Sequence, residues 1–216
     1  YACGDSVSCD EKKAVQFFQK AADMAETLGR YNVGVMCLHG RGVKSNPTAA
    51  AKWFRLAAEK GHASAQFALG HLLANGEGVE HNDTEAVHFY REAAGQGHAL
   101  AQNNLGVMFA QGRGVEQDDV EAVRYYRQAA DQGVVAAKQN LGWRLALGIG
   151  VDRDERGAQE LLEQAASEGA LRPEMAFELG SRLASSGGEA DAVHWYQMAA
   201  EQGHAEAQFQ MGRIYY

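Results

Sequence analysis

The chain has 216 residues and a formal net charge of −8 at pH 7, from 20 lysines and arginines and 28 aspartates and glutamates. Nucleic-acid binding depends on clustered basic residues, so this balance argues against a DNA or RNA partner. No stretch approaches the roughly 18 apolar residues that a transmembrane helix requires, so no transmembrane segment is predicted.

The N-terminal segment, residues 1–9, shows no periodicity, and we expect it to be a flexible end before a single solenoid over residues 10–216. Ser8 followed by Glu11 is typical of a capping box, which predicts the start of the first helix there. Three interpretations fit Cys3 and Cys9, which precede the repeats. In the first, the two cysteines form a disulfide in an oxidising compartment. In the second, Cys3 is acylated at the end of a lipoprotein signal. In the third, both cysteines are free thiols.

The rest of the chain follows a 36-residue repeat, whose Gly-x-Gly-Val turn places its second glycine at residues 42, 78, 114 and 150. Each repeat begins with a helix whose apolar residues recur at i, i+3, i+4, i+7 and i+8, which forms one apolar face. Short polar residues suited to N-capping precede this helix at Asn46, Asn82, Asp118 and Asp154. Pro47 then fits the first helical position. Glycines that suit a left-handed helix end mark the repeat junctions near residues 61, 97, 133, 169 and 203.

A second helix in each repeat carries a glycine, at positions 34, 70, 106, 142, 180 and 212. Glycine inside a helix costs about 1 kcal/mol relative to alanine, so its recurrence predicts a close helix crossing that a side chain would block. The preceding residues Leu69, Leu105 and Leu141 are expected to be buried. The sequence thus predicts an all-α fold of about five to six helix-turn-helix repeats and about twelve helices, beginning and ending in half-repeats. Irregular spacing in the fifth repeat predicts a change of stacking angle near residues 170–190.

The pattern A-x-x-W/F-Y/F-x-x-A-A-x-x-G-H-x-x-A-Q-x-x-L-G-x-x-Y/L-x-x-G-x-G-V resembles the Sel-one-like repeat, a relative of the tetratricopeptide repeat, over residues 10–216. The resemblance implies a right-handed α/α superhelix with a concave groove. It also implies a non-enzymatic scaffold or adaptor that binds a protein or peptide. Many bacterial members are exported, which implies a periplasmic or secreted location, with the cytoplasm as the alternative.

Two other functions are associated with the same family. One is a bacterial immunity protein that neutralises a secreted toxin or effector. The other is a hydrolase of the β-lactam-binding type, which is less favoured because those members carry a cysteine pair in each repeat and this chain does not. Because no nucleophile, base and orienting residue converge at repeat spacing, we predict no catalytic residues and no cofactor.

Tetratricopeptide geometry, applied to the second helix, points three positions of each repeat into the groove. The predicted protein-binding residues are Tyr31, His39, Phe67, His71, Asn75, Asn103, Gln111, Gln139, Trp143, Leu147, Phe177, Ser181, Phe209 and Arg213, together with Val35, Val107 and Ser185. Arg213 is the one full charge among them, and aromatic residues with few charges are typical of an interface core. The alternative is that several of them, above all Val35 and Val107, pack between neighbouring repeats.

Trp143 is the strongest candidate anchor for a ligand, with Gln139, Leu147, Phe177 and Asn103 expected around it. Trp53 and Trp195 follow the apolar face of the first helix, and we expect them in the core. Met211, Tyr215 and Tyr216 form one side of the last helix. We expect further residues, another partner or a second copy to cover them, the last by end-to-end self-association through residues 205–216.

Other polar residues are interpreted as structural. His62, His98 and His204 share one repeat position. His39 and His71 lack a third ligand, so no metal site is predicted. Cys37 is expected to be a small buried residue, because other repeats place Leu73, Phe109 and Leu145 there. The Gly-x-Gly-Val turns follow helices rather than strands, which argues against a phosphate loop.

Overall fold

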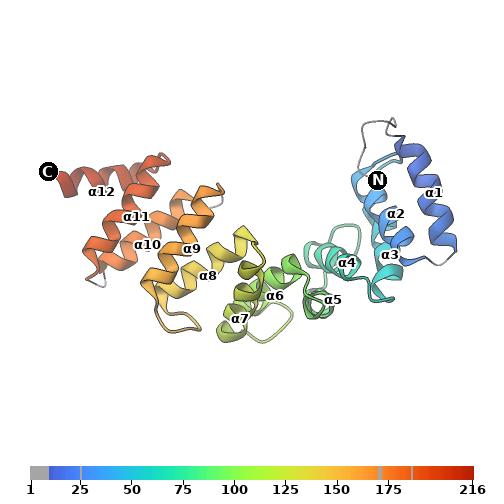
Figure 1. Ribbon diagram of the computed structural model, residues 1–216, viewed down its shortest axis with the longest axis horizontal. Helices are drawn as coiled ribbons and strands as arrows, with labels where there is room; N and C mark the ends of the chain where they lie inside the picture. Colours follow the sequence, from blue (N-terminus) through green and yellow to red (C-terminus); the bar gives the residue numbers. More distant parts are fainter. Residues whose placement is uncertain (1–9, 25, 170–171, 186) are drawn as a thin grey trace. The chain divides into compact units, whose positions relative to one another are not determined.

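The computed structural model describes residues 10–24, 26–169, 172–185 and 187–216, and these residues form twelve α-helices and no strand, as expected (Figure 1). The helices are α1 Glu11–Asp23, α2 Thr27–His39, α3 Pro47–Ala58, α4 Ala63–Asn75, α5 Asp83–Gly95, α6 Ala99–Gln111, α7 Asp119–Asp131, α8 Val135–Leu147, α9 Glu155–Ser167, α10 Pro173–Ser185, α11 Glu189–Glu201 and α12 Ala205–Tyr215.

The chain divides into two compact units, the first containing α1 to α6 and the second α7 to α12. In the first unit α2 packs against α3, and α4 against α5; in the second, α8 packs against α9, and α10 against α11. These are contacts between one repeat and the next. No described helix is long and apolar enough to cross a membrane.

The first helix of each repeat begins at the polar caps that the sequence predicts. The side chains of Asn46, Asn82 and Asp154 each accept a hydrogen bond from the backbone N–H three residues later. The first helix of the chain differs from the prediction, since its cap is Asp10, which accepts from the N–H of Lys13 at 3.0 Å. Ser8, like Cys3 and Cys9, lies outside the described residues.

The Gly-x-Gly-Val turn keeps its spacing because neither glycine tolerates a side chain. The first glycine ends the second helix in the left-handed conformation, with φ between 64° and 68° at residues 40, 76, 112 and 148. The second glycine also has positive φ, and it lies against the first turn of the first helix in the same repeat. A Cβ built on Gly114 or Gly150 would overlap the backbone of Asp83 or Asp119. Both conformation and space therefore require glycine here.

The core consists mainly of alanines, the leucines before the helical glycines, and one or two large residues from each of the first helices α3, α5, α7, α9 and α11. Leu69 and Leu105 are 0% exposed and Leu141 is 4% exposed, which confirms the predicted core positions. The large core residues of these first helices are Phe54, Phe89, Tyr90, Tyr126, Leu162, Trp195 and Tyr196. Burial raises the pKa of Tyr126 to about 12, because the phenolate would lose its hydration there.

The neighbouring position on the first helix is less buried than we expected. Trp195 is 4% exposed and lies in the core, whereas Trp53 is only partly buried. The core position is therefore fully covered at Trp195 and at the corresponding Phe89, 6% exposed, but only partly at Trp53, so the core assignment holds for Trp195 and not for Trp53. Cys37 also differs from the prediction, since it is only partly buried; desolvation nevertheless raises the pKa of its thiol. Residues 170, 171 and 186 lie outside the described part, so the change of stacking angle there stays a prediction.

Candidate functional site

The histidine that the sequence places at one point of three repeats caps the second helix. The Nδ1 atoms of His62, His98 and His204 accept hydrogen bonds from the backbone N–H three residues later, at 3.2, 3.3 and 3.2 Å. A protonated Nδ1 cannot accept, so the cap requires neutral imidazole. Desolvation by the surrounding residues lowers the pKa of His98, which favours this neutral form.

Each capping imidazole also stacks on an aromatic ring from the preceding repeat. The ring centroids of Tyr31 and His62 are 4.7 Å apart, and the other stacked pairs, Phe67–His98 and Phe177–His204, are 4.7 and 4.6 Å apart. Three of the predicted groove residues are therefore occupied in contacts between repeats. They are partly buried, as the alternative interpretation of the groove requires.

The other predicted groove residues differ in how much surface they offer. The exposed ones are His39, His71, Asn75, Gln111, Ser185, Phe209 and Arg213, and the partly buried ones are Val35, Val107, Gln139, Trp143, Leu147 and Ser181. Asn103 is only 8% exposed, so it presents little surface to a ligand. No group of three histidine, cysteine, aspartate or glutamate side chains suited to a metal ion occurs among the described residues.

A cavity of about 520 Å³ in the second unit joins three predicted groove residues. This α8–α10 pocket is lined by Ala146, Leu147, Ile149, Arg153, Glu178, Ser181, Arg182, Leu183 and Ser185. Its volume is typical of ligand-binding clefts, roughly 300–1,000 Å³. Leu147, Ser181 and Ser185 were predicted, and the other lining residues were not.

Ile149 shows how the missed residues could have been found. It is the second residue of its Gly-x-Gly-Val turn, where other repeats carry arginine or glutamate. Arg113 at this place pairs with Asp83 at 2.7 Å, against the first helix of the same repeat. In the fourth turn the corresponding carboxylate, Asp119, pairs with Arg144 of α8 instead, also at 2.7 Å. The apolar Ile149 is thus left to line the pocket, and this break in the charge pattern is visible in the sequence.

The polar groups of the pocket are already oriented by their own helix. The Ser181 hydroxyl donates to the carbonyl oxygen of Phe177 at 3.0 Å, and the Ser185 hydroxyl donates to that of Ser181 at 2.8 Å. Arg182 pairs with Glu178 at 2.7 Å. Both hydroxyls are thus engaged with backbone carbonyls of α10.

Trp143 lies beside this pocket, one helical turn before Leu147 on α8. The guanidinium of Arg182 lies over the Trp143 ring, 5.7 Å from the ring centroid. The indole is partly exposed, and no capping histidine stacks on it in the described part of the chain. One turn earlier, the Gln139 amide contacts the Met175 sulfur at 2.7 Å. The structure thus brings Trp143 together with the α8–α10 pocket.

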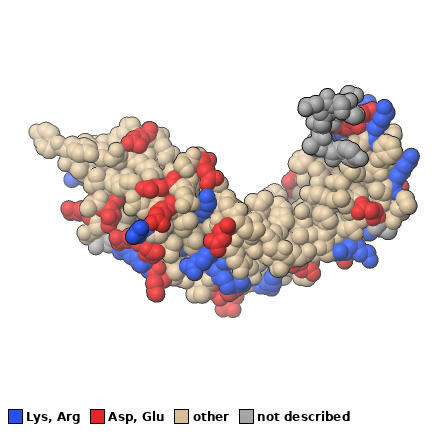
Figure 2. All heavy atoms as spheres, viewed as in Figure 1, with Lys and Arg blue, Asp and Glu red and all other residues tan. Residues whose placement is uncertain are grey.

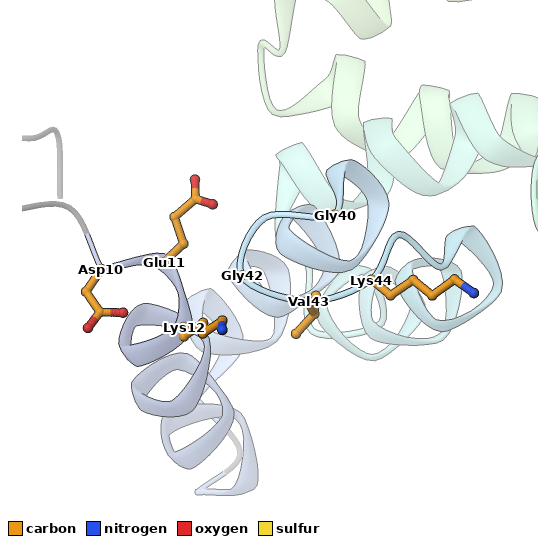
Figure 3. Close-up of a pocket in the computed structure, with 7 residues that line it drawn as sticks. All are labelled: Asp10, Glu11, Lys12, Gly40, Gly42, Val43 and Lys44. Atoms are coloured by element: carbon orange, nitrogen blue, oxygen red, sulfur yellow. The ribbon is translucent and has the colours of Figure 1, made fainter.

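Two further cavities are weaker candidates. One of about 940 Å³ lies between the start of α1 and the turn after α2 (Figure 3). Figure 3 shows the carboxylates of Asp10 and Glu11 and the amine of Lys44 pointing in three different directions, so these charged groups do not converge on one point. A smaller cavity of about 250 Å³ lies between α9 and α11, where His194 at the rim pairs with Glu163 at 3.2 Å.

Comparison with solved structures gives the relatives of this chain. A protective antigen of uropathogenic Escherichia coli with an SLR fold is 34% identical, with a TM-score of 0.82 over 98% of this chain and 46% of that one. This chain therefore spans about half the length of the antigen. A Sel1 repeat protein from Oxalobacter formigenes is also 34% identical, with a TM-score of 0.70 over 89% of this chain and 80% of that one.

A more distant likeness shows the fold alone. YrrB, a TPR protein described as having an unusual peptide-binding site, is 17% identical, with a TM-score of 0.64 over 91% of this chain and 98% of that one. None of the curated proteins is significantly similar to this chain. The model of the Sel1 repeat matches residues 1–25, 27–62, 63–98, 99–134, 135–169, 173–204 and 205–216. With nearly its whole length matched, and with relatives of the same description, this chain belongs to the Sel1 repeat family.

Proposed function

We propose that this chain is a non-enzymatic binding scaffold that holds a protein segment or peptide at the α8–α10 pocket, with Trp143 as the anchor. The observation that carries the proposal is the environment of Trp143. The rings of Tyr31, Phe67, Phe177 and Trp143 are all partly buried, but the first three stack on helix caps, whereas Trp143 contacts Arg182, which lines the cavity.

The lining of the pocket favours a peptide with a large apolar side chain next to a polar or acidic group. Leu147 and Ile149 provide apolar surface in the pocket, and Arg153 and Arg182 provide hydrogen-bond donors. Both arginines already pair with carboxylates, Glu155 and Glu178, so a ligand carboxylate or carbonyl would share or replace an existing partner. Tryptophan and arginine are the side chains most enriched at binding hot spots.

The proposal is tested by selecting peptides from a random display library on the wild-type chain and measuring their dissociation constants by calorimetry. Trp143→Ala should weaken binding by about 2 kcal/mol, roughly 30-fold. The same variant should lose less than about 1 kcal/mol of unfolding free energy, as surface changes do. Trp53→Ala is the matched control, because Trp53 is also partly buried but lies in the first unit; its peptide affinity should equal that of the wild type. Unchanged affinity in Trp143→Ala would contradict the proposal.

A further inference from the structure

The sulfur of Met175, at the start of α10, receives two hydrogen-bond donors from different parts of the chain. The amide Nε2 of Gln139, on α8, lies 2.7 Å from this sulfur. The guanidinium Nη2 of Arg172, in the segment before α10, lies 3.7 Å from it. The sulfur is therefore a contact point between one repeat and the next.

A thioether is a weak partner for such donors, because methionine sulfur accepts hydrogen bonds poorly. Other glutamine amides of the second helices donate to oxygen instead. Those of Gln66, Gln102 and Gln208 donate to backbone carbonyl oxygens at 3.3, 3.4 and 3.2 Å. Oxidation converts a thioether into a polar sulfoxide, which would give the Gln139 amide an oxygen acceptor as well.

The six methionines differ in how far a small oxidant can reach them, and the described residues include all six. Three are 3% to 9% exposed and lie in the core: Met36, Met108 and Met211. Met211 is among them although we expected a partner to cover it. Met24 is 84% exposed, and Met175 and Met198 are partly buried. Met175 therefore combines a partly exposed side chain with donors that the protein supplies. The charged atoms that Figure 2 shows around it on the surface of the second unit are not needed for this contact.

We propose that Met175 is a site of reversible oxidation by peroxide, and that the Gln139 amide and the Arg172 guanidinium hold the sulfoxide oxygen. A lone pair on the sulfur attacks one oxygen of hydrogen peroxide, so the S–O bond forms as the O–O bond breaks. The sulfur loses two electrons, and the peroxide gains them. The departing hydroxide takes the proton of the transferred oxygen and leaves as water. Methionine sulfoxide reductases reverse such a change.

The two donors compensate for a change that normally disturbs packing. Methionine sulfoxide is polar, so its formation disrupts apolar contacts. A polar group that is partly buried costs free energy unless it finds a hydrogen-bond partner. At Met175 both partners are in place, and because one belongs to α8, the oxidised side chain keeps α8 and α10 joined. Neither donor lines the α8–α10 pocket, so this site is independent of the proposed peptide function.

Oxidation makes the sulfur a chiral centre, and this chirality provides the test. The wild type is treated with hydrogen peroxide under native conditions and digested, and the sulfoxides are mapped by mass spectrometry. The oxidised peptides are then treated with the two classes of methionine sulfoxide reductase, each of which reduces one epimer. At Met175 one epimer should be about fivefold in excess, the factor that one ordinary hydrogen bond supplies. Met24 should give nearly equal amounts of both, because it is 84% exposed.

Two variants separate the donors from the shape of the site. Gln139→Leu removes the amide and keeps a side chain of similar size and good helix propensity. The epimer excess at Met175 should fall to near equality, whereas a bias caused only by the shape of the site would remain. Arg172→Ala, at an exposed residue outside the helices, should also reduce the excess. Circular dichroism melting of the unoxidised variants checks that each is folded.

The effect on stability is measured in a chain that carries Met24→Leu and Met198→Leu, so that Met175 is the one methionine outside the buried group. Peroxide treatment should leave the urea midpoint of this chain nearly unchanged. With Gln139→Leu added, oxidation should lower the equilibrium constant for folding about fivefold, because the new oxygen loses a partner. An unreactive Met175, equal epimers in the wild type, an excess that survives both donor substitutions, or equal losses of stability with and without Gln139 would overturn the proposal.

Discussion

Helices α4 and α8 occupy the same place in their repeats, yet the aromatic residues that they carry on the predicted groove face make different contacts. In α4, the aromatic residue is Phe67, whose ring stacks on His98, the cap of the next second helix. In α8, the corresponding residue is Gln139, and the aromatic residue is Trp143, one turn further on and beside the α8–α10 pocket. The cap differs as well, since α4 has His62 and α8 has Val134, which provides no side-chain hydrogen bond.

The contact that an aromatic residue makes in this repeat depends on what the next repeat supplies. A ring at the Phe67 position stacks on the capping imidazole of His98. Trp143 contacts the guanidinium of Arg182 instead. Four expected outcomes test this comparison.

The largest expected effect concerns the buried leucine that α4 and α8 each carry at the equivalent position. Leu69→Ala and Leu141→Ala should each lower the free energy of unfolding by roughly 2–5 kcal/mol, because both leucines are buried and leave a cavity. Leu105→Ala in α6 should cost a similar amount for the same reason. Urea denaturation followed by circular dichroism measures these losses. A melting temperature unchanged by any of them would show that the repeats are misaligned.

The next effect separates the two aromatic residues. Phe67→Ala should lower the free energy of unfolding by about 2 kcal/mol, through loss of burial and of the stack on His98. Trp143→Ala should cost less than about 1 kcal/mol, although it removes a larger side chain. The same denaturation experiment compares the two variants. Equal losses would mean that Trp143 is as structural as Phe67.

A smaller effect concerns the missing cap of α8. Val134→Asp places a carboxylate at the helix start, where it can accept from the free N–H groups and interact favourably with the helix dipole. We expect a gain of about 1 kcal/mol in unfolding free energy. His62→Val in α4 is the reverse change and should lose a comparable amount, because the Nδ1 acceptor of Ala65 disappears. Thermal melts of both variants at neutral pH measure the pair, and a loss of stability in Val134→Asp would count against the capping account.

The smallest effect is a dependence on pH through His98. Its pKa is lowered in the folded chain, so the unfolded chain binds the proton more readily. The contribution of this group is therefore fully present above the unfolded pKa of about 6.5 and decreases as the pH falls below it. His98→Asn keeps a capping side chain that does not titrate. Its unfolding free energy should fall less between pH 7 and pH 5 than that of the wild type, and an identical decline would rule out His98 as a contributor.

Most features of the fold could be predicted from the amino-acid sequence. The twelve helices, three of the four caps named for the first helices, the glycine-marked ends and the buried leucines all follow from the 36-residue pattern. These features depend on local sterics and on hydrogen bonds within a few residues. A glycine in the left-handed region or an asparagine at a helix start has the same role wherever the repeat recurs.

The contacts of the predicted groove residues could not be predicted in the same way, because they depend on how the repeats pack. The sequence placed Tyr31, Phe67, Phe177 and Trp143 in one class, because all lie on the same predicted face. Their different roles depend on what the next repeat supplies: a capping imidazole for the first three, and the guanidinium of Arg182 for Trp143. The sequence pattern of one helix predicts which of its side chains point away from its buried face. The side chains that meet them come from another helix, and their positions are fixed only when the repeats pack.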